Sequence, residues 1–223
     1  MAHARQGPRL IEPEAFIRAH TTIGTAPLVP EIQLCLADEI TPLWQDLETW
    51  LGTPNVAPPY WAFVWPGGQA LTRYLLDHPE LVRGRRVLDL ASGCGVAAIA
   101  MAKGGARVDA SEIDPVASAA IGLNAALNGV AIDVLTEDLT DRHAAAWNVI
   151  VAGDICYEKG MTEAVFPWLQ QAARNGATVL MADPGRDYLP RSGLVEVGRY
   201  LVQTSLDLER GERRDTMVYR VGD

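Results

Sequence analysis

The chain contains few cysteines and no pattern that would join them in a metal site or a disulfide framework. Its 223 residues include three scattered cysteines, Cys35, Cys94 and Cys156, and no C-x-x-C pair. An odd and dispersed set of this kind predicts neither disulfides nor a zinc site. The four histidines show no ligand spacing, so we expect no bound metal. Reduced thiols are typical of the cytoplasm, which is the location we expect.

Long apolar runs and a surplus of positive charge are also missing. No segment approaches the roughly 18 consecutive apolar residues of a membrane span. The first residues lack the apolar stretch of a secretory signal peptide. With 19 Lys and Arg against 28 Asp and Glu, the formal net charge is −9. Because proteins that bind duplexes normally present a basic face, we do not expect a nucleic acid as partner. Because no membrane span is predicted, we do not expect a membrane as partner either.

From residue 68 onward, strand-like and helix-like segments alternate. Short apolar runs that predict strands occur at 85–91, 106–113, 132–138, 147–154 and 177–183. Amphipathic or alanine-rich helices are predicted between them, and Pro167 is expected to kink or split the helix over 158–176. Alternation of this kind predicts an α/β fold with a doubly wound, mostly parallel sheet and helices on both faces.

The two ends of the chain depart from this alternation. The runs at 194–206 and 213–221 are strand-like and are joined by a short charged segment, which predicts a C-terminal antiparallel hairpin. Residues 1–67 combine two short helices, the second over 41–51, with a half-buried strand and a loop rich in proline and aromatics. We therefore expect a small N-terminal α/β extension over 1–67, forming a lid on the cofactor and substrate, and the main domain over 68–223.

The segment "VLDLASGCGVAAIA" has the G-x-G-x-x-G/A spacing of a dinucleotide-binding loop. A pyrophosphate needs backbone N–H groups at a helix N-terminus and no competing negative charge nearby. Asp89 lies four residues before Gly93, at the start of this loop, where it would repel a pyrophosphate. The loop is therefore expected to hold a ligand that carries positive charge.

Four consecutive predicted strands end on or beside a carboxylate: Asp89, Glu112, Asp138 and Asp154. In an open parallel sheet, ligands bind outside the carboxyl ends of the strands. Glu112 is placed to accept hydrogen bonds from ribose hydroxyls, and Asp138 to accept one from an adenine amine. A nucleoside with a cationic tail suits this set, and S-adenosylmethionine is the common cofactor of that kind.

The successive motifs "VLDLASGCG", "ASEID", "TEDL" and "VIVAGDICY" resemble those of the seven-strand, Rossmann-like methyltransferases that depend on S-adenosylmethionine. The segment "PPYWAFVWPGGQALTRYLL" and the D-x-x-Y pattern from Asp154 to Tyr157 resemble the protein lysine methyltransferases of this fold. They are most similar to the branch that acts on the beta subunit of electron transfer flavoprotein. The resemblance implies a seven-stranded sheet closed by an antiparallel hairpin, S-adenosylmethionine as cofactor, and that subunit as partner.

The resemblance also implies which residues bind the cofactor. These are Trp65, Asp89, Ala91, Gly93, Gly95, Glu112, Asp138 and Leu139. Asp89 and the backbone of the glycine loop are expected to contact the methionine part. Glu112 is expected to hold the ribose, and Asp138 with Leu139 the adenine. Trp65 is expected to line the cofactor pocket from the N-terminal side.

By the same resemblance, Asp154 and Tyr157 face the substrate nitrogen as catalytic residues. A lysine amine, with an ordinary pKa of about 10.4, must be neutral to attack, and an apolar aromatic channel favours that form. Asp154 and Tyr157 are expected to orient the lone pair, and Asp154 to help remove the proton. Three alternatives stay open: methylation of another amine, on a ribosomal protein or a nicotinamide-like molecule; a cofactor-binding regulator without catalysis; and an NAD(P) oxidoreductase.

Overall fold

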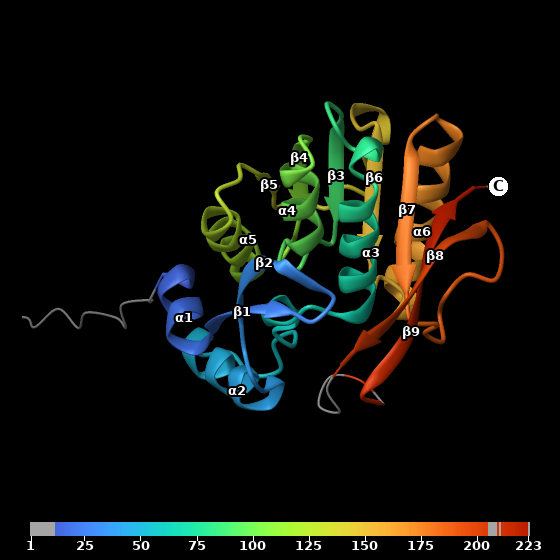
Figure 1. Ribbon diagram of the computed structural model, residues 1–223. Coiled ribbons are helices and arrows are strands. Elements are labelled where there is room, and N and C mark those ends of the chain that lie inside the picture. Colours follow the sequence, from blue (N-terminus) through green and yellow to red (C-terminus); the bar gives the residue numbers. More distant parts are fainter. Residues whose placement is uncertain (1–11, 205–208, 210, 223) are drawn as a thin grey trace, which may run out of the picture.

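The computed structural model describes residues 12–204, 209 and 211–222, which are built around one large sheet (Figure 1). Its seven strands lie in the order β5-β4-β3-β6-β7-β9-β8. Their bounds are β3 Arg86–Leu90, β4 Arg107–Ser111, β5 Asp133–Leu135, β6 Val149–Gly153, β7 Thr178–Asp183, β8 Leu194–Gln203 and β9 Arg213–Val221. The first five are parallel, whereas β9 runs antiparallel to β7 and to β8. The predicted fold class, with its five parallel strands and closing hairpin, is confirmed.

The strand order reverses between β3 and β6, because β4 and β5 extend the sheet on one side and β7 extends it on the other. The helices α3 (Pro66–Asp77), α4 (Val96–Lys103), α5 (Pro115–Leu127) and α6 (Lys159–Arg174) accompany these strands. Short 3-10 turns occur at η1 (Tyr60–Ala62), η2 (Pro79–Leu81) and η3 (Ala144–Ala146). In sheets of this kind the reversal leaves a crevice in which ligands bind.

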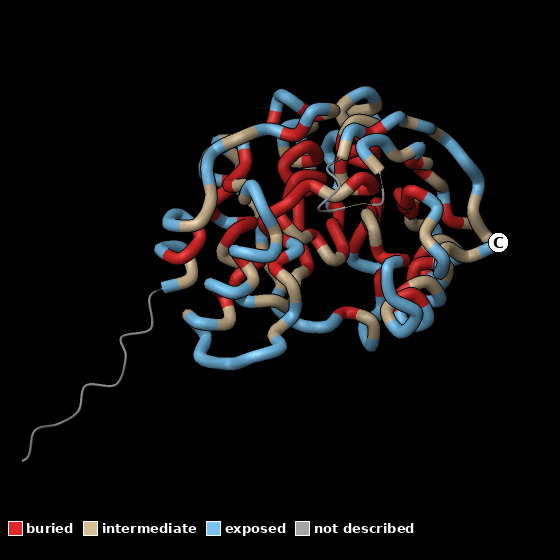
Figure 2. The backbone as a smooth tube through the Cα atoms, turned by 90° about the horizontal axis from the view of Figure 1, so that it is seen from below, coloured by how far each residue is buried: buried red, intermediate tan, exposed pale blue. Residues whose placement is uncertain are grey.

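Alternate residues of the central strands pack on opposite faces of the sheet. Val87 and Val149 share a core with residues of α3, α4 and α5. Leu88 and Ile150 share another core with Leu169 and other residues of α6. Both faces are therefore covered, which explains why these strands consist of continuous apolar runs. In Figure 2 the buried segments run through the middle of the molecule and the exposed ones surround them.

The helix α6 is one continuous element, so the predicted split at Pro167 is wrong, whereas the alternative of a kink stays a prediction. Pro167 lies on the exposed side, whereas Val165, Trp168 and Leu169 pack against the sheet. Proline removes one backbone hydrogen bond of the helix. Burial of the apolar residues on the opposite side offsets that loss. No described helix has the length and apolar character that crossing a membrane requires.

The N-terminal elements are α1 (Pro13–His20), β1 (Thr22–Ala26), β2 (Val29–Leu36) and α2 (Ile40–Leu51). The strands β1 and β2 form a separate antiparallel pair, of which the sequence predicted only β2. Phe16 and Leu47 share a buried cluster with Ala120 of α5. The proposed boundary at 67/68 falls inside α3, which begins at Pro66. The division into 1–67 and 68–223 stays a prediction.

Candidate functional site

A cavity of about 960 Å³ opens at the carboxyl ends of β3, β4 and β6. This volume is within the range of small-molecule binding sites. Among the described residues that line it, Arg186 has the single positive charge, and seven residues have carboxyl groups. These seven are Asp89, Glu112, Asp114, Asp138, Asp154, Glu158 and Glu209. Such a wall favours a ligand with positive charge.

Nine of the ten residues that the sequence singled out line this one cavity. The exception is Gly95, which lies between the glycine loop and α5. A Cβ atom at Gly95 would lie 3.2 Å from Cγ2 of Ile121, and its φ is +80°. Gly95 therefore allows α5 to pack closely against the loop. Ala91 and Gly93 also have positive φ, at 54° and 55°, and both reach the cavity wall.

Asp89 is a buried carboxyl group beneath the glycine loop. Its Oδ2 accepts hydrogen bonds from Ser92 Oγ at 2.6 Å and from the backbone N–H of Ala98 at 3.0 Å. Burial raises the pKa of Asp89 to about 7, although these two hydrogen bonds act to lower it. A positive charge in the cavity would favour the ionised form. Asp89 is therefore poised to respond to a cationic ligand.

Glu112 connects the end of β4 to the glycine loop. Its Oε2 accepts a hydrogen bond from Gly93 N at 3.0 Å and its Oε1 one from Asp114 N at 3.1 Å. Burial raises the pKa of Glu112. Asp138 is exposed, and its Oδ1 accepts hydrogen bonds from both N–H and hydroxyl of Thr140, which lower its pKa. Both carboxyl groups are thus held by the backbone at the cavity wall.

Five aromatic side chains line the other part of the wall: Tyr60, Trp61, Phe63, Trp65 and Tyr157. The indole N–H of Trp65 donates to the carbonyl oxygen of Tyr60 at 3.0 Å. The ring of Tyr60 lies 5.5 Å from that of Trp65 and 5.4 Å from that of Tyr157. Burial raises the pKa of both tyrosine hydroxyls, so they stay protonated near neutral pH. Tyr60 was missed by the sequence analysis, although "PPYW" is part of a segment that the resemblance rested on.

Asp154 follows β6 in a left-handed backbone conformation, with φ of 59°. Its Oδ2 accepts a hydrogen bond from Gly68 N at 2.7 Å, at the N-terminus of α3. Its Oδ1 forms an ion pair with the guanidinium of Arg186. Both oxygens are therefore engaged. The carboxylate is thus held in one orientation at the cavity wall.

The sequence analysis did not select Arg186, Asp183 or Glu209. Asp183 ends β7 and is fully buried, so the rule that picked out carboxylates at four strand ends would have found it at the fifth. Arg186 follows in the same loop. Glu209 lies in the connection between β8 and β9, and no local sequence pattern marks it.

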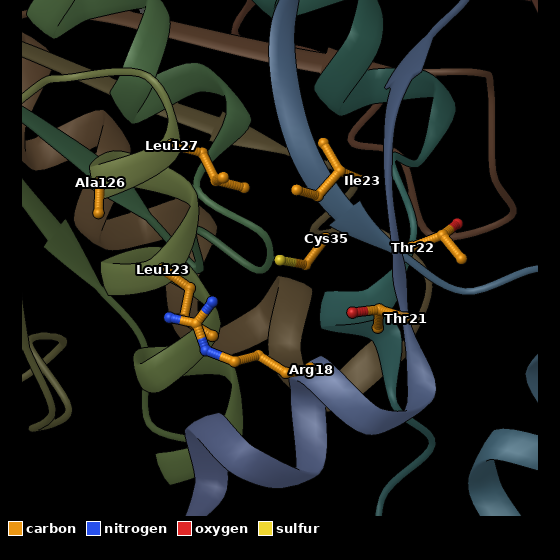
Figure 3. A pocket seen from close by; sticks show the side chains of 8 residues that line it. All are labelled: Arg18, Thr21, Thr22, Ile23, Cys35, Leu123, Ala126 and Leu127. Atoms are coloured by element: carbon orange, nitrogen blue, oxygen red, sulfur yellow. The ribbon is translucent and has the colours of Figure 1, made fainter.

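A second hollow, of about 430 Å³, lies between α1, β1 and α5 (Figure 3). The described residues that line it include no carboxyl group. Its one charged side chain is that of Arg18, and apolar residues such as Ile23 and Leu127 form much of the wall. It lacks the groups that a cationic nucleoside needs. The carboxylate-lined cavity is therefore the candidate active site.

Sequence comparison finds a matching family and named relatives of this chain. A family model described as lysine methyltransferase matches residues 60–188. The chain is 46% identical over 178 residues to the electron transfer flavoprotein beta subunit lysine methyltransferase of Xenopus laevis, covering 78% of this chain and 71% of that protein. It is 41% identical over 186 residues to the Homo sapiens protein of the same name, covering 79% and 68%.

Solved structures agree with the fold. The Pyrococcus abyssi tRNA (uracil-54, C5)-methyltransferase, in complex with S-adenosyl-L-homocysteine, superposes with a TM-score of 0.51 at 14% sequence identity. The match covers 67% of this chain and 38% of that one. At such low identity the likeness concerns the fold alone.

Proposed function

Because this chain belongs to the lysine methyltransferase family, whose model matches residues 60–188, we propose that it methylates a lysine of the electron transfer flavoprotein beta subunit, with S-adenosylmethionine as cofactor. One observation carries the proposal. A single cavity joins the carboxyl groups of Asp89, Glu112 and Asp138 to the aromatic side chains of Tyr60 and Tyr157. The first group suits a cationic nucleoside, and the second suits a lysine side chain.

The described residues suit the cofactor on chemical grounds. Asp89 has only its Oδ2 hydrogen-bonded within the described chain, and its raised pKa supports a ligand that brings compensating positive charge. Glu112 would hold ribose hydroxyls, and Asp138 with Leu139 would hold the adenine. When bound, S-adenosylmethionine supplies a methyl group on a positively charged sulfur.

The substrate end of the cavity has the groups that an amine needs. The rings of Tyr60 and Tyr157 would exclude water from the lysine nitrogen, which favours its neutral form. The lysine would lose its proton to solvent before it enters this part of the cavity, and Asp154 would then orient the neutral nitrogen. With the nitrogen held by these residues, the cofactor would supply its methyl group for an in-line displacement in which the sulfur keeps the electron pair of the carbon–sulfur bond. Positioning supplies most of the acceleration in such a displacement.

We also propose that the protein acts in the cytoplasm and does not use nucleic acid as substrate. The formal net charge of −9 supports a partner that is not a polyanion. Cys35, Cys94 and Cys156 are all free and buried, which supports a reducing compartment. Burial raises the pKa of both Cys94 and Cys156 to about 12, so neither is suited to act as a nucleophile.

The proposed function is tested with purified protein, recombinant flavoprotein beta subunit and S-adenosylmethionine that carries a labelled methyl group. Mass spectrometry should find label on a lysine of the subunit. Label on a ribosomal protein, a small amine or RNA, but not on the subunit, would overturn the substrate assignment. If calorimetry shows that the protein binds NAD and does not bind S-adenosylmethionine, the cofactor assignment is wrong.

Two variants connect this activity to the cavity. Asp154→Asn should lower the turnover about 100-fold, because the amine loses the carboxylate that orients it, and should leave cofactor affinity nearly unchanged. Glu163→Gln is the matched control, since Glu163 is an exposed carboxylate on α6 outside the cavity wall. Equal turnover in the two variants would exclude the proposed role of Asp154.

A further inference from the structure

Arg186 connects three carboxyl groups that come from different parts of the chain. Its Nη1 forms an ion pair with Asp154, which follows β6, and lies 3.6 Å from Oδ2 of Asp183, which ends β7. Its Nη2 lies 2.6 Å from Oε1 of Glu209, in the connection between β8 and β9. The side chain of Arg186 is only 14% exposed. One guanidinium thus lies against the carboxyl groups of all three acids, which are largely buried.

The local turn does not need this guanidinium. Oδ1 of Asp183 accepts hydrogen bonds from the backbone N–H groups of Gly185 and Arg186, both at 2.7 Å. These two bonds fix the chain after β7 whatever the side chain at position 186 is. The guanidinium itself points back to the cavity, where it lies among the lining residues. Two of its three carboxylate contacts, those with Asp154 and Glu209, therefore reach outside the turn, to residues that line the cavity.

Asp154 is fixed from two sides, and Arg186 is one of them. Oδ2 is held by Gly68 N, and a Cβ atom at Gly67 would lie 2.6 Å from the same oxygen. The N-terminus of α3 therefore approaches this oxygen as closely as glycine allows. Oδ1 has only the guanidinium of Arg186 as partner among the described residues. Without it the carboxylate could turn about its side-chain bonds.

We propose that Arg186 is a positioning residue for the methyl transfer: it holds the Asp154 carboxylate in the orientation that the substrate amine meets, and it balances the charge of Asp183 and Glu209 behind it. The inference rests on the proposed function. Arg186 acts through Asp154 and does not itself contact the reacting atoms. Its planar, two-ended guanidinium is required because a lysine cannot bind two carboxylates in this fixed geometry.

Charge around the cluster makes the proposal testable by pH. Facing Arg186 are Asp154, Asp183 and Glu209, and Arg214 of β9 lies 3.7 Å from Glu209. The α3 N-terminus faces Asp154 through Gly68 N. The thiol of Cys156 and the hydroxyl of Tyr219 are near Asp183. Removal of the guanidinium takes away a positive charge that lowers the pKa of the buried Asp183 carboxyl group, so that pKa rises further.

The experiment measures turnover, cofactor affinity and the pH profile of Arg186→Met and Arg186→Lys on the flavoprotein beta subunit. In Arg186→Met we expect kcat to fall about 100-fold, cofactor Kd to stay within about twofold, and the acidic limb of the pH profile to move up by about one unit or more. In Arg186→Lys we expect the acidic limb to stay near that of the unsubstituted protein. Its kcat should be about tenfold reduced, because the charge is kept and the geometry is lost.

The control is Arg199→Met, which removes an exposed arginine paired with Glu196 on β8 and should leave all three quantities unchanged. A purely structural role would lower kcat and cofactor affinity together, with an unshifted pH profile and no partial recovery by lysine, and that result overturns the inference. If circular dichroism shows that Arg186→Met does not fold, Arg186→Lys decides, and an unreduced kcat in it overturns the inference.

The outcomes that would contradict the proposed function differ from those that would contradict the role of Arg186. If the unsubstituted protein transfers no methyl group to the flavoprotein subunit, the proposed function is wrong and the role of Arg186 falls with it. If the unsubstituted protein is active and both Arg186 variants match it, only the role of Arg186 is wrong.

Discussion

Asp89 makes cofactor binding depend on pH. Its pKa is about 7 because burial penalises the charged carboxyl group. A bound cation favours the ionised form, so below pH 7 binding must also release a proton. We expect the affinity for S-adenosylmethionine to rise about tenfold per pH unit up to about pH 7 and to level off above it. Calorimetry in buffers of different ionisation enthalpy measures both the affinity and the released proton.

The variants Asp89→Asn and Glu112→Gln separate this effect from the neighbouring carboxyl group. Asp89→Asn should bind the cofactor more weakly and lose the rise below pH 7, whereas Glu112→Gln should keep the rise. Asp89 also makes the stability of the fold depend on pH. Its pKa increases from 3.8 to about 7 on folding, so its contribution to stability is full below pH 3.8 and is lost as the pH rises through 7. If the cofactor affinity of Asp89→Asn still rises with pH below pH 7, the pH dependence of binding does not come from Asp89.

Gly67 and Gly68 are adjacent but differ in the space around them. A Cβ atom at Gly67 would lie 2.5 Å from the carbonyl oxygen of Ala182, whereas the nearest atom at Gly68, Cγ1 of Val96, is 3.7 Å away. We expect Gly67→Ala to lower the free energy of unfolding by about 1–3 kcal/mol and to reduce turnover, since α3 must move away from Asp154. Gly68→Ala should be neutral or more stable by up to about 1 kcal/mol. Urea unfolding compares them, and equal stabilities would refute the steric argument.

At the level of whole elements, the helix α6 contains Pro167, which makes the helix less stable than alanine at that position would. Proline inside a helix is about 3 kcal/mol less favourable than alanine, and its stiffening of the unfolded chain offsets up to about 1 kcal/mol. Pro167→Ala should therefore raise the free energy of unfolding by about 2 kcal/mol. Turnover should not change, because Pro167 is outside the cavity wall.

The matched control is Pro115→Ala, at the first position of α5, where proline costs the helix nothing. It should give no gain in urea unfolding. A gain at position 115 as large as that at position 167 would mean that the effect arises in the unfolded chain.

On the scale of the whole molecule, the N-terminal elements and the main sheet are expected to unfold together. Leu47 of α2 is buried in a cluster with Trp61 and with Ala117 of α5. Leu47→Ala should lower the free energy of unfolding by about 2–5 kcal/mol and keep a single transition. Tryptophan fluorescence and circular dichroism should report the same midpoint. Two separate transitions would instead support an N-terminal unit that folds by itself.

Regular elements of the fold could be predicted because their signals are local. Short apolar runs located β3, β4, β5, β6 and β7, and the pair Asp114-Pro115 located the start of α5, where Asp114 caps the helix as expected. Strand β1 was missed, because "TIGTA" is short, contains glycine and alternates poorly. The helix α6 was predicted as well, but Pro167 does not split it, because burial of the opposite face offsets the lost hydrogen bond.

Much of the site was predictable for a topological reason. Parallel strands present their carboxyl ends at one edge, so Asp89, Glu112, Asp138 and Asp154 had to gather there once the alternation of strands and helices was recognised. Arg186 and Glu209 could not be found in this way. They are 23 positions apart and meet only because the hairpin of β8 and β9 folds back beside β7.

The sequence by itself determined the order of the elements and the sign of the ligand's charge, since both depend on the spacing of residues along the chain. Only the tertiary structure decided how the carboxyl groups are used. It buries Asp89 until its pKa is about 7, and it engages both oxygens of Asp154, one with a helix N-terminus and one with Arg186. The physical reason is that burial and hydrogen-bond partners arise from packing between distant segments, which no local pattern contains.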